Sequence, residues 1–496
     1  MAVTGSSTSG PLAPTLAVQL ERSRGAPPLI DQLAAQIRRA IETGEVPGAS
    51  RLPSTRALAG QLGVSRTVTS EAYATLLAEG YLESRRGSGT YVVERVVEAP
   101  PEVPRPESGS TRSRWLPQAV APADVDPPAD PSAPFRICEP DAVVFPDAAW
   151  RTAARSAVNE AFDEGYPPPE GDADLRQKIA AFLLQERGLA VSADELMVTS
   201  GTAQSLDLIA RATLRPGARV AFEDPGYRLA RQIFTDRGAV IDPVPADDHG
   251  LVTDALVDGP GSATPTVAYV TPSHQFPIGG ALSFRRRRAL LEWAVRRDVL
   301  VVEDDYDSEF RFDGPVLPAL RTGDAKATVA YLGTFSKSLS PRLRLGYVIA
   351  PPPLREALLR LKVRSDQGTH WLTQRILARY LGTGAFARHL RRMRRLYRRR
   401  RDALVEAFEP LPDGVRWCGL AAGLHATLLL PPSVPAEEVK AAAKRGGVTV
   451  ASLADYQLAA PAQNGLVLGY GASPEAQVAA AGRTLRRLIE DRLGRP

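Results

Sequence analysis

The proline-rich stretch from Val96 to Pro134 most limits what this chain can fold into. It holds ten prolines among Glu, Ser and Asp residues and has no apolar periodicity, which is typical of a partly extended linker. A chain of 496 residues is also too long for a single core. We therefore expect two folded parts, residues 27–95 and 135–490, joined by a linker over 96–134. Residues 1–26 are rich in Ser, Gly, Thr and Pro and are predicted to form a disordered tail.

The composition excludes several classes of protein. The longest apolar runs are too short to span a bilayer, and the first residues lack the pattern of a secretory signal. Cys138 and Cys418 are the only cysteines, which argues against a disulfide framework and for a reducing cytoplasm. The formal charge of +5 is modest for this length, so charge alone does not establish nucleic-acid binding. The sequence predicts a cytoplasmic protein with no membrane partner.

Residues 29–94 carry the pattern of three helices followed by a hairpin. Apolar residues recur every four positions from Leu29 to Ile41, which predicts the first helix. A short second helix ends at Gly63, and Ser65 can cap a third helix. The segment GYLESRRGSGTYVVE, residues 80–94, predicts a two-stranded hairpin. This is the layout of a helix-turn-helix with a wing, in which the third helix takes the recognition position.

The stretch RLPSTRALAGQLGVSRTVTSEAYATLLAEGYLESRRGSGTYV resembles, in order and spacing, the winged-helix domain of the GntR family of bacterial repressors. The first turn of the third helix would present short or forked donors to phosphates and base edges, and the N-terminus of the second helix favours phosphate. From the residues alone, the alternative is a small helical domain that binds protein. The candidate DNA-binding residues are Arg51, Ser54, Thr55, Arg56, Ser65, Arg66, Thr67, Thr69 and, at the tip of the wing, Gly89.

From Phe135 onward, strand-like and helix-like segments alternate, which predicts an open, mostly parallel α/β sheet. In five places an apolar strand runs into a polar segment, and sheets of this kind bind ligands at the carboxyl ends of their strands. We therefore expect these polar segments to form one site. The five stretches are 196–214, 219–227, 266–280, 299–312 and 327–347.

The last of these stretches places Lys337, one of only six lysines, in a hydroxyl-rich loop followed by Arg342 and Arg344. A lysine amine forms a Schiff base with an aldehyde when it is held in a desolvated or cationic setting. Nearby Ser and Arg side chains are the groups that hold a phosphate dianion. The combination suggests a pyridoxal phosphate site, and the alternative is a solvated loop lysine.

The other polar segments each allow a second interpretation. Residues 200–202, Ser-Gly-Thr, could form an anion cradle at a helix N-terminus or an ordinary helix cap. Tyr227 could stack on a flat ring or pack in the core. The acidic segment 303–307 could bind Mg²⁺ or Ca²⁺ or form a solvated rim. His274 is given little weight, because a single histidine is more often structural than catalytic.

Residues 135–490 as a set resemble the fold-type I, aspartate-aminotransferase-like pyridoxal phosphate enzymes. With the GntR-type N-terminus, the whole chain resembles a MocR-type regulator, and TPSHQFP and EDDYDSEFR are especially similar to that subfamily. The resemblance implies a multidomain protein in which a winged helix precedes an α/β aminotransferase-like domain. That domain would have a large subdomain at about 170–360 and a smaller α+β C-terminal subdomain at about 380–490.

The resemblance also implies roles for individual residues. Lys337 would form the internal aldimine, Asp304 would pair with the pyridine nitrogen so that the ring can act as an electron sink, and Tyr306 would meet the ring hydroxyl. Tyr227 would stack on the ring, no metal is expected, and a homodimer is implied. The other cofactor-binding residues would be Ser200, Gly201, Thr202, Gln275, Ser336, Arg344 and Tyr166 of the partner subunit.

One position departs from the catalytic family. That family places an arginine near the C-terminus that clamps the substrate carboxylate, whereas LVLGYG, residues 466–471, places Val467 there. An aliphatic side chain cannot clamp a carboxylate, and losing the contact costs on the order of 2–5 kcal/mol in transition-state binding. Turnover of an amino acid is therefore not expected, and whether the chain is an enzyme stays open.

Residues 387–408 predict one long amphipathic helix that carries nine arginines between Arg388 and Arg401. A solvated face is favoured over a stripe that contacts DNA, because charge runs on helices usually face water.

These observations predict a transcriptional regulator that binds operator DNA, dimerises head-to-tail and responds to pyridoxal phosphate or an amino compound as effector. Genes of vitamin B6 metabolism are the first candidates for its targets. One alternative is an active aminotransferase with an appended DNA-binding module. Another is a DNA-binding protein whose large domain is only a dimerisation scaffold.

Overall fold

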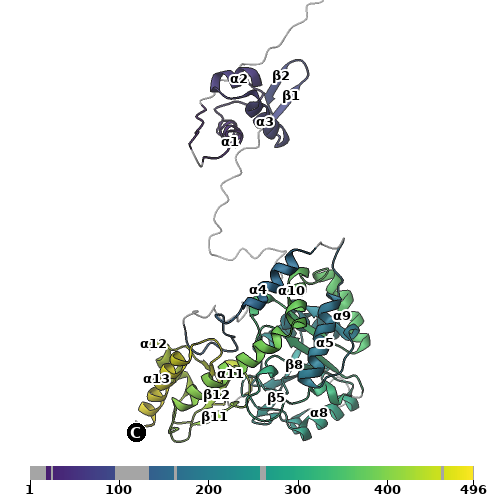
Figure 1. Ribbon diagram of the computed structural model, residues 1–496, viewed down its shortest axis with the longest axis vertical. Helices are drawn as coiled ribbons and strands as arrows, with labels where there is room; N and C mark the ends of the chain where they lie inside the picture. Colours follow the sequence, from purple (N-terminus) through teal and green to yellow (C-terminus); the bar gives the residue numbers. More distant parts are fainter. Residues whose placement is uncertain are drawn as a thin grey trace, which may run out of the picture. The chain divides into compact units, whose positions relative to one another are not determined.

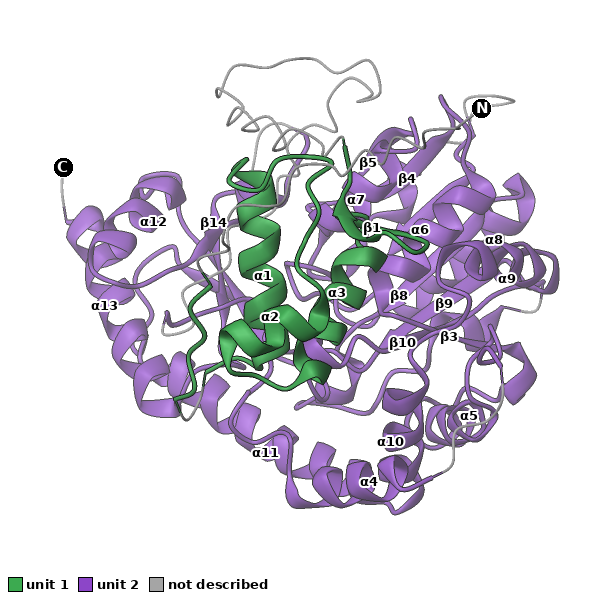
Figure 2. Cartoon of the chain, turned by 90° about the horizontal axis from the view of Figure 1, so that it is seen from above, with its two compact units in different colours: residues 1–117 green, residues 118–496 purple. Residues whose placement is uncertain are grey.

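The computed structural model describes residues 18–23, 26–94, 133–160, 165–256, 264–324, 326–459 and 463–494. The chain divides into two compact units, 1–117 and 118–496 (Figure 2). Most of the predicted tail and of the predicted linker lies outside the described residues. Within the tail, Gln19 is described, and its backbone N–H and C=O bond to the side chain of Gln36.

The first unit is a winged helix, as predicted (Figure 1). Ser54 and Ser65 cap the second and third helices by accepting hydrogen bonds from the N–H groups of Ala57 and Val68. Gly63 ends the second helix in the left-handed region, at φ 61°. Apolar side chains of all three helices form one core. Its elements are α1 (Leu29–Glu42), α2 (Thr55–Leu62), α3 (Arg66–Ala78) and the antiparallel strands β1 (Leu82–Arg85) and β2 (Gly89–Val92).

An eight-stranded sheet organises the second unit, in the order β3-β10-β9-β8-β7-β4-β5-β6. The central strands β9, β8, β7, β4 and β5 are parallel, while β10 and β6 run antiparallel to their neighbours. In Figure 2, the labels of β8, β9, β10 and β3 lie close together within the unit. The strands are β3 (Leu196–Thr199), β4 (Arg219–Asp224), β5 (Val240–Asp247), β6 (Gly250–Leu251), β7 (Val267–Val270), β8 (Leu300–Asp305), β9 (Val329–Thr334) and β10 (Gly346–Ile349).

Helices cover both faces of this sheet, which is why its strands read as continuous apolar runs. Val220 and Phe222 of β4 pack under α6, α7 and α9, and Ala221, which points the other way, packs under α8. The helices of the large subdomain and its flank are α4 (Ala148–Val158), α5 (Ala173–Arg187), α6 (Thr202–Thr213), α7 (Arg228–Thr235), α8 (Phe284–Arg297), α9 (Pro352–Ser365), α10 (Trp371–Gly382) and α11 (Ala385–Glu406).

A smaller antiparallel sheet follows, in the order β11-β12-β14-β13, and forms the expected C-terminal α+β subdomain. Leu404 of α11 and Leu485 of α13 belong to the core beside it. None of the described helices combines the length and the apolar character that a membrane crossing needs. The elements are β11 (Arg416–Cys418), β12 (His425–Leu429), α12 (Ala436–Arg445), β13 (Ala451–Ser452), β14 (Gly465–Gly469) and α13 (Glu475–Leu493).

Candidate functional site

Segments that follow five strands of the large sheet meet around one cavity of about 460 Å³. Seven of the predicted cofactor residues line this cavity. They lie at the ends of these strands or in the segments that follow them, and the segment after β7 contributes none of the seven. The cavity is closed on its other sides by residues near position 137 and by Tyr456. The predicted residues that line the cavity are Thr202, Tyr227, Asp304, Tyr306, Ser336, Lys337 and Arg344.

Asp304, at the end of β8, is the most constrained of these side chains. It is 4 % exposed, and its Oδ2 accepts a hydrogen bond of 2.7 Å from the hydroxyl of Tyr269. Its Oδ1 has no hydrogen-bond partner among the described residues. Burial is the main cause that raises the pKa of Asp304 to about 7. A buried oxygen without a partner is costly, so this wall of the cavity fits a ligand that supplies a cationic N–H group there.

Another part of the cavity lining, around the start of α6, is suited to an anion. Gly201 precedes α6 at a φ of 109°, a conformation that favours glycine. A Cβ at this position would lie 3.0 Å from Nη2 of Arg344, so the guanidinium packs against the N-terminus of the helix. Free N–H groups of the first helical turn and a guanidinium are phosphate ligands. Ser200 lines a neighbouring pocket that also contains Arg344.

Lys337 lies on the loop after β9 and lines the same cavity. Its amine makes no hydrogen bond or ion pair with any residue that the structure describes. Ser336, the residue before it, is buried and accepts a hydrogen bond of 3.0 Å from the hydroxyl of Thr334. This amine is therefore open to an aldehyde in the cavity.

Two predicted cofactor residues lie elsewhere. Gln275 is fully buried. Its amide donates to the C=O of Pro225 at 2.8 Å and accepts from the N–H of Ile278 at 3.1 Å, so it ties its own loop to the loop after β4 and does not line the cavity. Tyr166 is 81 % exposed and lies outside the cavity of its own chain. Its contact with a partner subunit stays a prediction.

The acidic segment 303–307 is neither a solvated rim nor one shared ligand set. Glu303 accepts from the backbone of Leu320 at 2.7 Å, and Asp305 forms an ion pair of 2.9 Å with Arg187. All the acids of this segment are buried, because the strand carries them into the interior before it ends. The expectation of a rim is therefore wrong.

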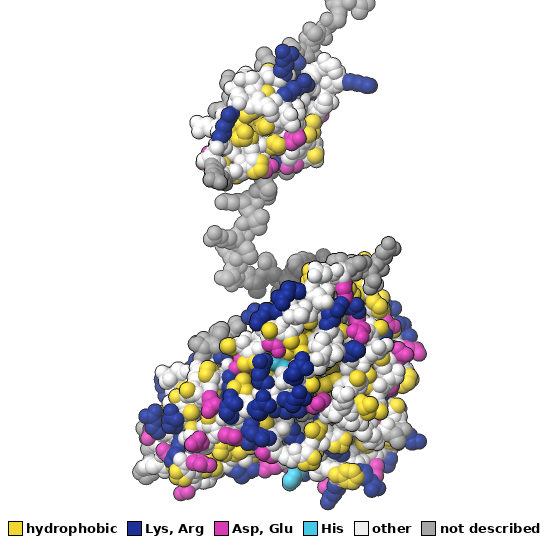
Figure 3. Space-filling model, viewed as in Figure 1, with side chains coloured by type: hydrophobic (Ala, Val, Ile, Leu, Met, Phe, Trp, Pro, Cys, Tyr) yellow, Lys and Arg dark blue, Asp and Glu magenta, His cyan; other side chains and the backbone are white. Residues whose placement is uncertain are grey.

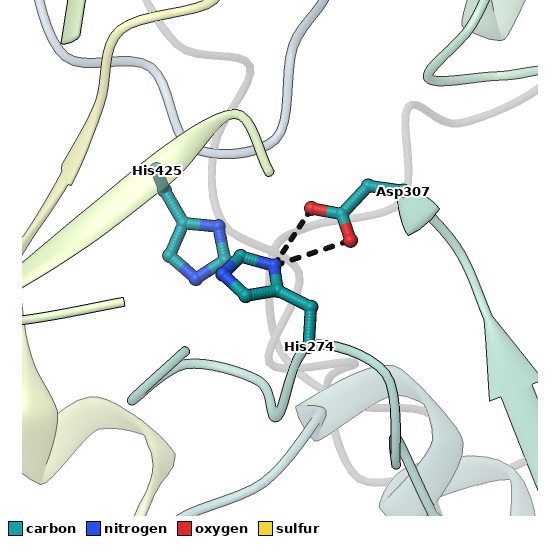
Figure 4. A group of neighbouring side chains, drawn as sticks. All are labelled: His274, Asp307 and His425. Carbon is teal, nitrogen blue, oxygen red and sulfur yellow. Dashed lines mark hydrogen bonds and ion pairs between the residues drawn. The ribbon is translucent and has the colours of Figure 1, made fainter. Parts of the chain in front are cut away.

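A group of three buried side chains lies behind Tyr306: His274, Asp307 and His425 (Figure 4). One donor atom from each lies within 4.8 Å of the others. Nδ1 of His274 is 2.9 Å from Oδ2 of Asp307. His425 contacts the thiol of Cys138 at 3.5 Å and the C=O of Pro277 at 3.1 Å, and burial holds its pKa well below the usual value. Sequence reasoning did not single out His425, because the three residues meet only in the folded chain.

Sequence reasoning also missed other residues of the cavity. Arg228 follows Tyr227 directly, so its position after β4 was the available signal, whereas Tyr269 sits inside an apolar strand and gave none. Val467 on β14 is fully buried and packs with Phe276 and Tyr456, which line the cavity. Arg228 and Arg344 are thus the cavity's arginines among the described residues.

The predicted DNA-binding residues of the first unit fall into two sets. Arg51, Arg56, Arg66 and Thr67 are exposed, as are the capping residues Ser54 and Ser65 and the wing residue Gly89; Thr55 is half-buried. Thr69 is fully buried, and its hydroxyl donates to the C=O groups of Thr55 and Arg66. Thr69 therefore fastens α3 to α2 and does not face a groove, which corrects the prediction for this residue.

The predicted arginine-rich helix is α11, and Figure 3 shows Lys and Arg side chains gathered on the face that contains it. Several of these arginines are ion-paired, including Arg394 with Glu186 and Arg401 with Asp313. Such pairing is what a solvated face provides, and contact with DNA stays an open alternative.

Comparisons with known proteins give the family. Residues 29–92 match the family described as "Bacterial regulatory proteins, gntR family", and residues 141–462 match "Aminotransferase class I and II". The pyridoxine biosynthesis transcriptional regulator PdxR of Corynebacterium glutamicum is 38 % identical over 90 % of this chain and 92 % of its own length. The probable rhizopine catabolism regulatory protein MocR of Rhizobium meliloti is 34 % identical over 89 % and 90 %.

Solved structures to which the second unit is similar include aminotransferases. The multiple substrate aminotransferase of Thermococcus profundus covers 73 % of this chain, with a TM-score of 0.68 and 29 % identity, and 92 % of that protein is matched. The kynurenine aminotransferase of Pyrococcus horikoshii gives the same TM-score at 28 % identity, over 73 % of this chain and 91 % of its own. With a GntR winged helix before a class I and II aminotransferase fold, the chain belongs to the MocR-type family of helix-turn-helix transcriptional regulators.

Proposed function

We propose that this protein is a transcriptional regulator whose winged helix binds operator DNA and whose cavity binds pyridoxal 5'-phosphate on Lys337. The observation that carries the proposal is the buried Oδ1 of Asp304, which has no hydrogen-bond partner among the described residues. Asp304 lines a cavity that also contains Lys337 and an anion cradle. These three groups match a cationic ring nitrogen, an aldehyde and a phosphate. Pyridoxal phosphate is the cofactor that carries all three.

Each residue has a role in holding the cofactor. The amine of Lys337 would condense with the aldehyde, releasing water. Asp304 would accept from the ring N–H, and Arg344 with the N-terminus of α6 would bind the phosphate. Tyr227, which packs edge-to-face on Phe276 with ring centroids 5.8 Å apart, would lie against the ring. Burial raises the pKa of the Tyr227 hydroxyl, so this side chain would stay neutral beside the cofactor.

The regulatory part of the proposal is that the cofactor changes operator binding. A ligand shifts such an equilibrium only by its different affinity for the two states, so the cofactor must bind one arrangement of a dimer more tightly. We propose a head-to-tail homodimer in the cytoplasm. Because the relative PdxR is named for pyridoxine biosynthesis, genes of vitamin B6 metabolism are the proposed targets.

The cofactor proposal is tested by mixing the purified chain with pyridoxal phosphate, recording the absorbance spectrum and reducing the product with borohydride. The expected result is a yellow product and a stable adduct that peptide mapping assigns to Lys337. A colourless mixture without any adduct at Lys337 would reject the proposal.

A second candidate function, transamination, is favoured by one observation. Arg228 lines the cavity, and a guanidinium is the kind of group that binds a carboxylate. The loaded protein should therefore be exposed to a panel of amino acids while its spectrum is followed. A complete half-reaction would make the chain an aminotransferase with an appended DNA-binding unit, and an unchanged spectrum favours the regulator.

A further inference from the structure

The side chains of Asp307 and Tyr306 both contact one nitrogen atom of the buried His274. Nδ1 of His274 lies 2.9 and 3.1 Å from the two carboxylate oxygens of Asp307 and 3.0 Å from the hydroxyl of Tyr306. His274 is 2 % exposed and Asp307 1 % exposed, whereas the Tyr306 side chain lines the cavity. Whether Nδ1 of His274 carries a hydrogen therefore determines which of these groups donates a hydrogen bond and which accepts one.

The direction of these bonds follows from the chemistry of the groups. An ionised carboxylate only accepts hydrogen bonds, so Nδ1 of His274 must carry the hydrogen that Asp307 accepts. Nε2 has no hydrogen-bond partner among the described residues. This fits an unprotonated atom, because orphaned buried N–H groups are rare.

The hydroxyl of Tyr306 cannot then donate to Nδ1, because that nitrogen has no free lone pair. Its only hydrogen bond to the described part of the chain is the one with His274. The hydroxyl can accept from Nδ1, which leaves its own hydrogen to be donated into the cavity that the side chain lines.

The packing around His274 keeps this arrangement fixed. A Cβ at Gly423, just before β12, would lie 2.1 Å from Cε1 of His274 and 2.5 Å from Oδ2 of Asp307. A Cβ at Gly279 would lie 3.0 Å from Nε2. The C-terminal subdomain, at Gly423, and the loop after β7, at Gly279, therefore pack closely on the ring and restrict its rotation.

We propose that His274 and Asp307 are positioning residues that force the Tyr306 hydroxyl to donate its hydrogen into the cavity, toward an anionic ring oxygen of the bound cofactor. The inference rests on the proposed function. A hydrogen bond from this hydroxyl would stabilise negative charge on the ring oxygen. The nitrogen that joins Lys337 to the cofactor would then lose its proton at a lower pH. Replacing Asp307 with Asn lets an amide N–H face Nδ1, which favours the other histidine tautomer, as in serine proteases. Nδ1 would then compete for the hydrogen of Tyr306.

The first test needs no cofactor. The chain has five histidines, so ¹⁵N-histidine labelling of the full chain gives a simple spectrum, and His274→Gln assigns the signal of His274. We expect a protonated Nδ1 and an unprotonated Nε2, exchanged in Asp307→Asn. A wild-type ring protonated on Nε2 alone would overturn the proposal. A shift of both the His274 and His425 signals on adding one equivalent of Zn²⁺ would also overturn it, because the group would then be a metal site.

The second test follows the cofactor's absorbance band as a function of pH in wild type, Asp307→Asn, Tyr306→Phe and the double variant. Cys138, Asp304 and Tyr269 also act electrostatically on Tyr306 and are unchanged in all four proteins. We expect each single variant to raise the midpoint pH by about one unit, since a bond to a charged group is worth about tenfold or more. The double variant should show the same shift, not twice the shift.

The outcomes of the second test separate the two proposals. A wild-type protein without any band rejects the proposed function and this inference with it. A band whose midpoint moves in Tyr306→Phe but not in Asp307→Asn, or moves additively in the double variant, overturns the inference alone. Asp141→Asn is the matched control, because it removes a buried carboxylate paired with Arg400 outside the cavity. It should lower the melting temperature without moving the midpoint.

Discussion

The winged-helix unit and the cavity of the second unit expose their polar groups to opposite surroundings. Arg51, Arg56 and Arg66 stand in solvent, where a charge costs little. Asp304 is buried, and one of its oxygens has no partner in the part of the chain that the structure describes, where a polar group costs stability. Replacing an arginine of the winged helix should therefore change the affinity for DNA without changing the fold. Filling the cavity with a ligand should instead stabilise the second unit.

The largest expected effect is on thermal stability. Pyridoxal phosphate at 100 times its dissociation constant should add about 2.7 kcal/mol to the unit that binds it and nothing to the winged helix. Calorimetry of the full chain should show the transition of the second unit rising by several degrees while the transition of the first stays in place. In Lys337→Ala the rise should shrink. An equal rise in the two transition temperatures would contradict the expectation that the cofactor stabilises only the second unit.

The next effect is on DNA affinity. Arg66→Ala should weaken operator binding about 10- to 100-fold, because a base or phosphate contact from a recognition helix is worth about 1–3 kcal/mol. Fluorescence anisotropy at fixed salt measures this loss, and melting should show an unchanged fold. Thr69→Ala is the matched variant on the buried side of the same helix. It should destabilise the first unit by about 1–2 kcal/mol and weaken binding only where the unit unfolds.

A smaller effect concerns pH. The pKa of Asp304 is about 7 in the fold, above its unfolded value of about 3.9. Between pH 4 and pH 7 the folded protein thus binds more protons than the unfolded chain, and this carboxyl makes stability fall as pH rises. Asp304→Asn should remove this contribution to the pH dependence of stability. Between pH 4 and pH 7, the free energy of unfolding of the variant should rise by about 1 kcal/mol or more relative to that of wild type. Denaturant titrations of cofactor-free protein at both pH values check this, and parallel slopes would contradict it.

Much of the fold could be predicted, because helix and strand periodicity are local. Leu29 to Ile41 marked a helix, and the apolar runs before Thr202, Asp304 and Lys337 marked buried strands whose ends meet in parallel sheets. The position of a residue could thus be inferred better than the direction of its side chain.

The failures follow from that limit. Thr69 and Gln275 lie in the expected segments, but their polar groups bond to neighbouring backbone, which no local pattern reveals. The group of His274 and His425 joins residues 151 positions apart, so it exists only after the C-terminal subdomain packs on the sheet. The spacing of these two histidines in the sequence therefore does not predict that they lie together.

We propose above that pyridoxal phosphate bound in the Lys337 cavity changes the affinity of the protein for operator DNA. The most direct test measures operator affinity with and without pyridoxal phosphate, in wild type and in Lys337→Ala. We predict that the cofactor changes the affinity of wild type severalfold. The variant should bind DNA but show no such change. An equal response in both proteins would contradict the claim.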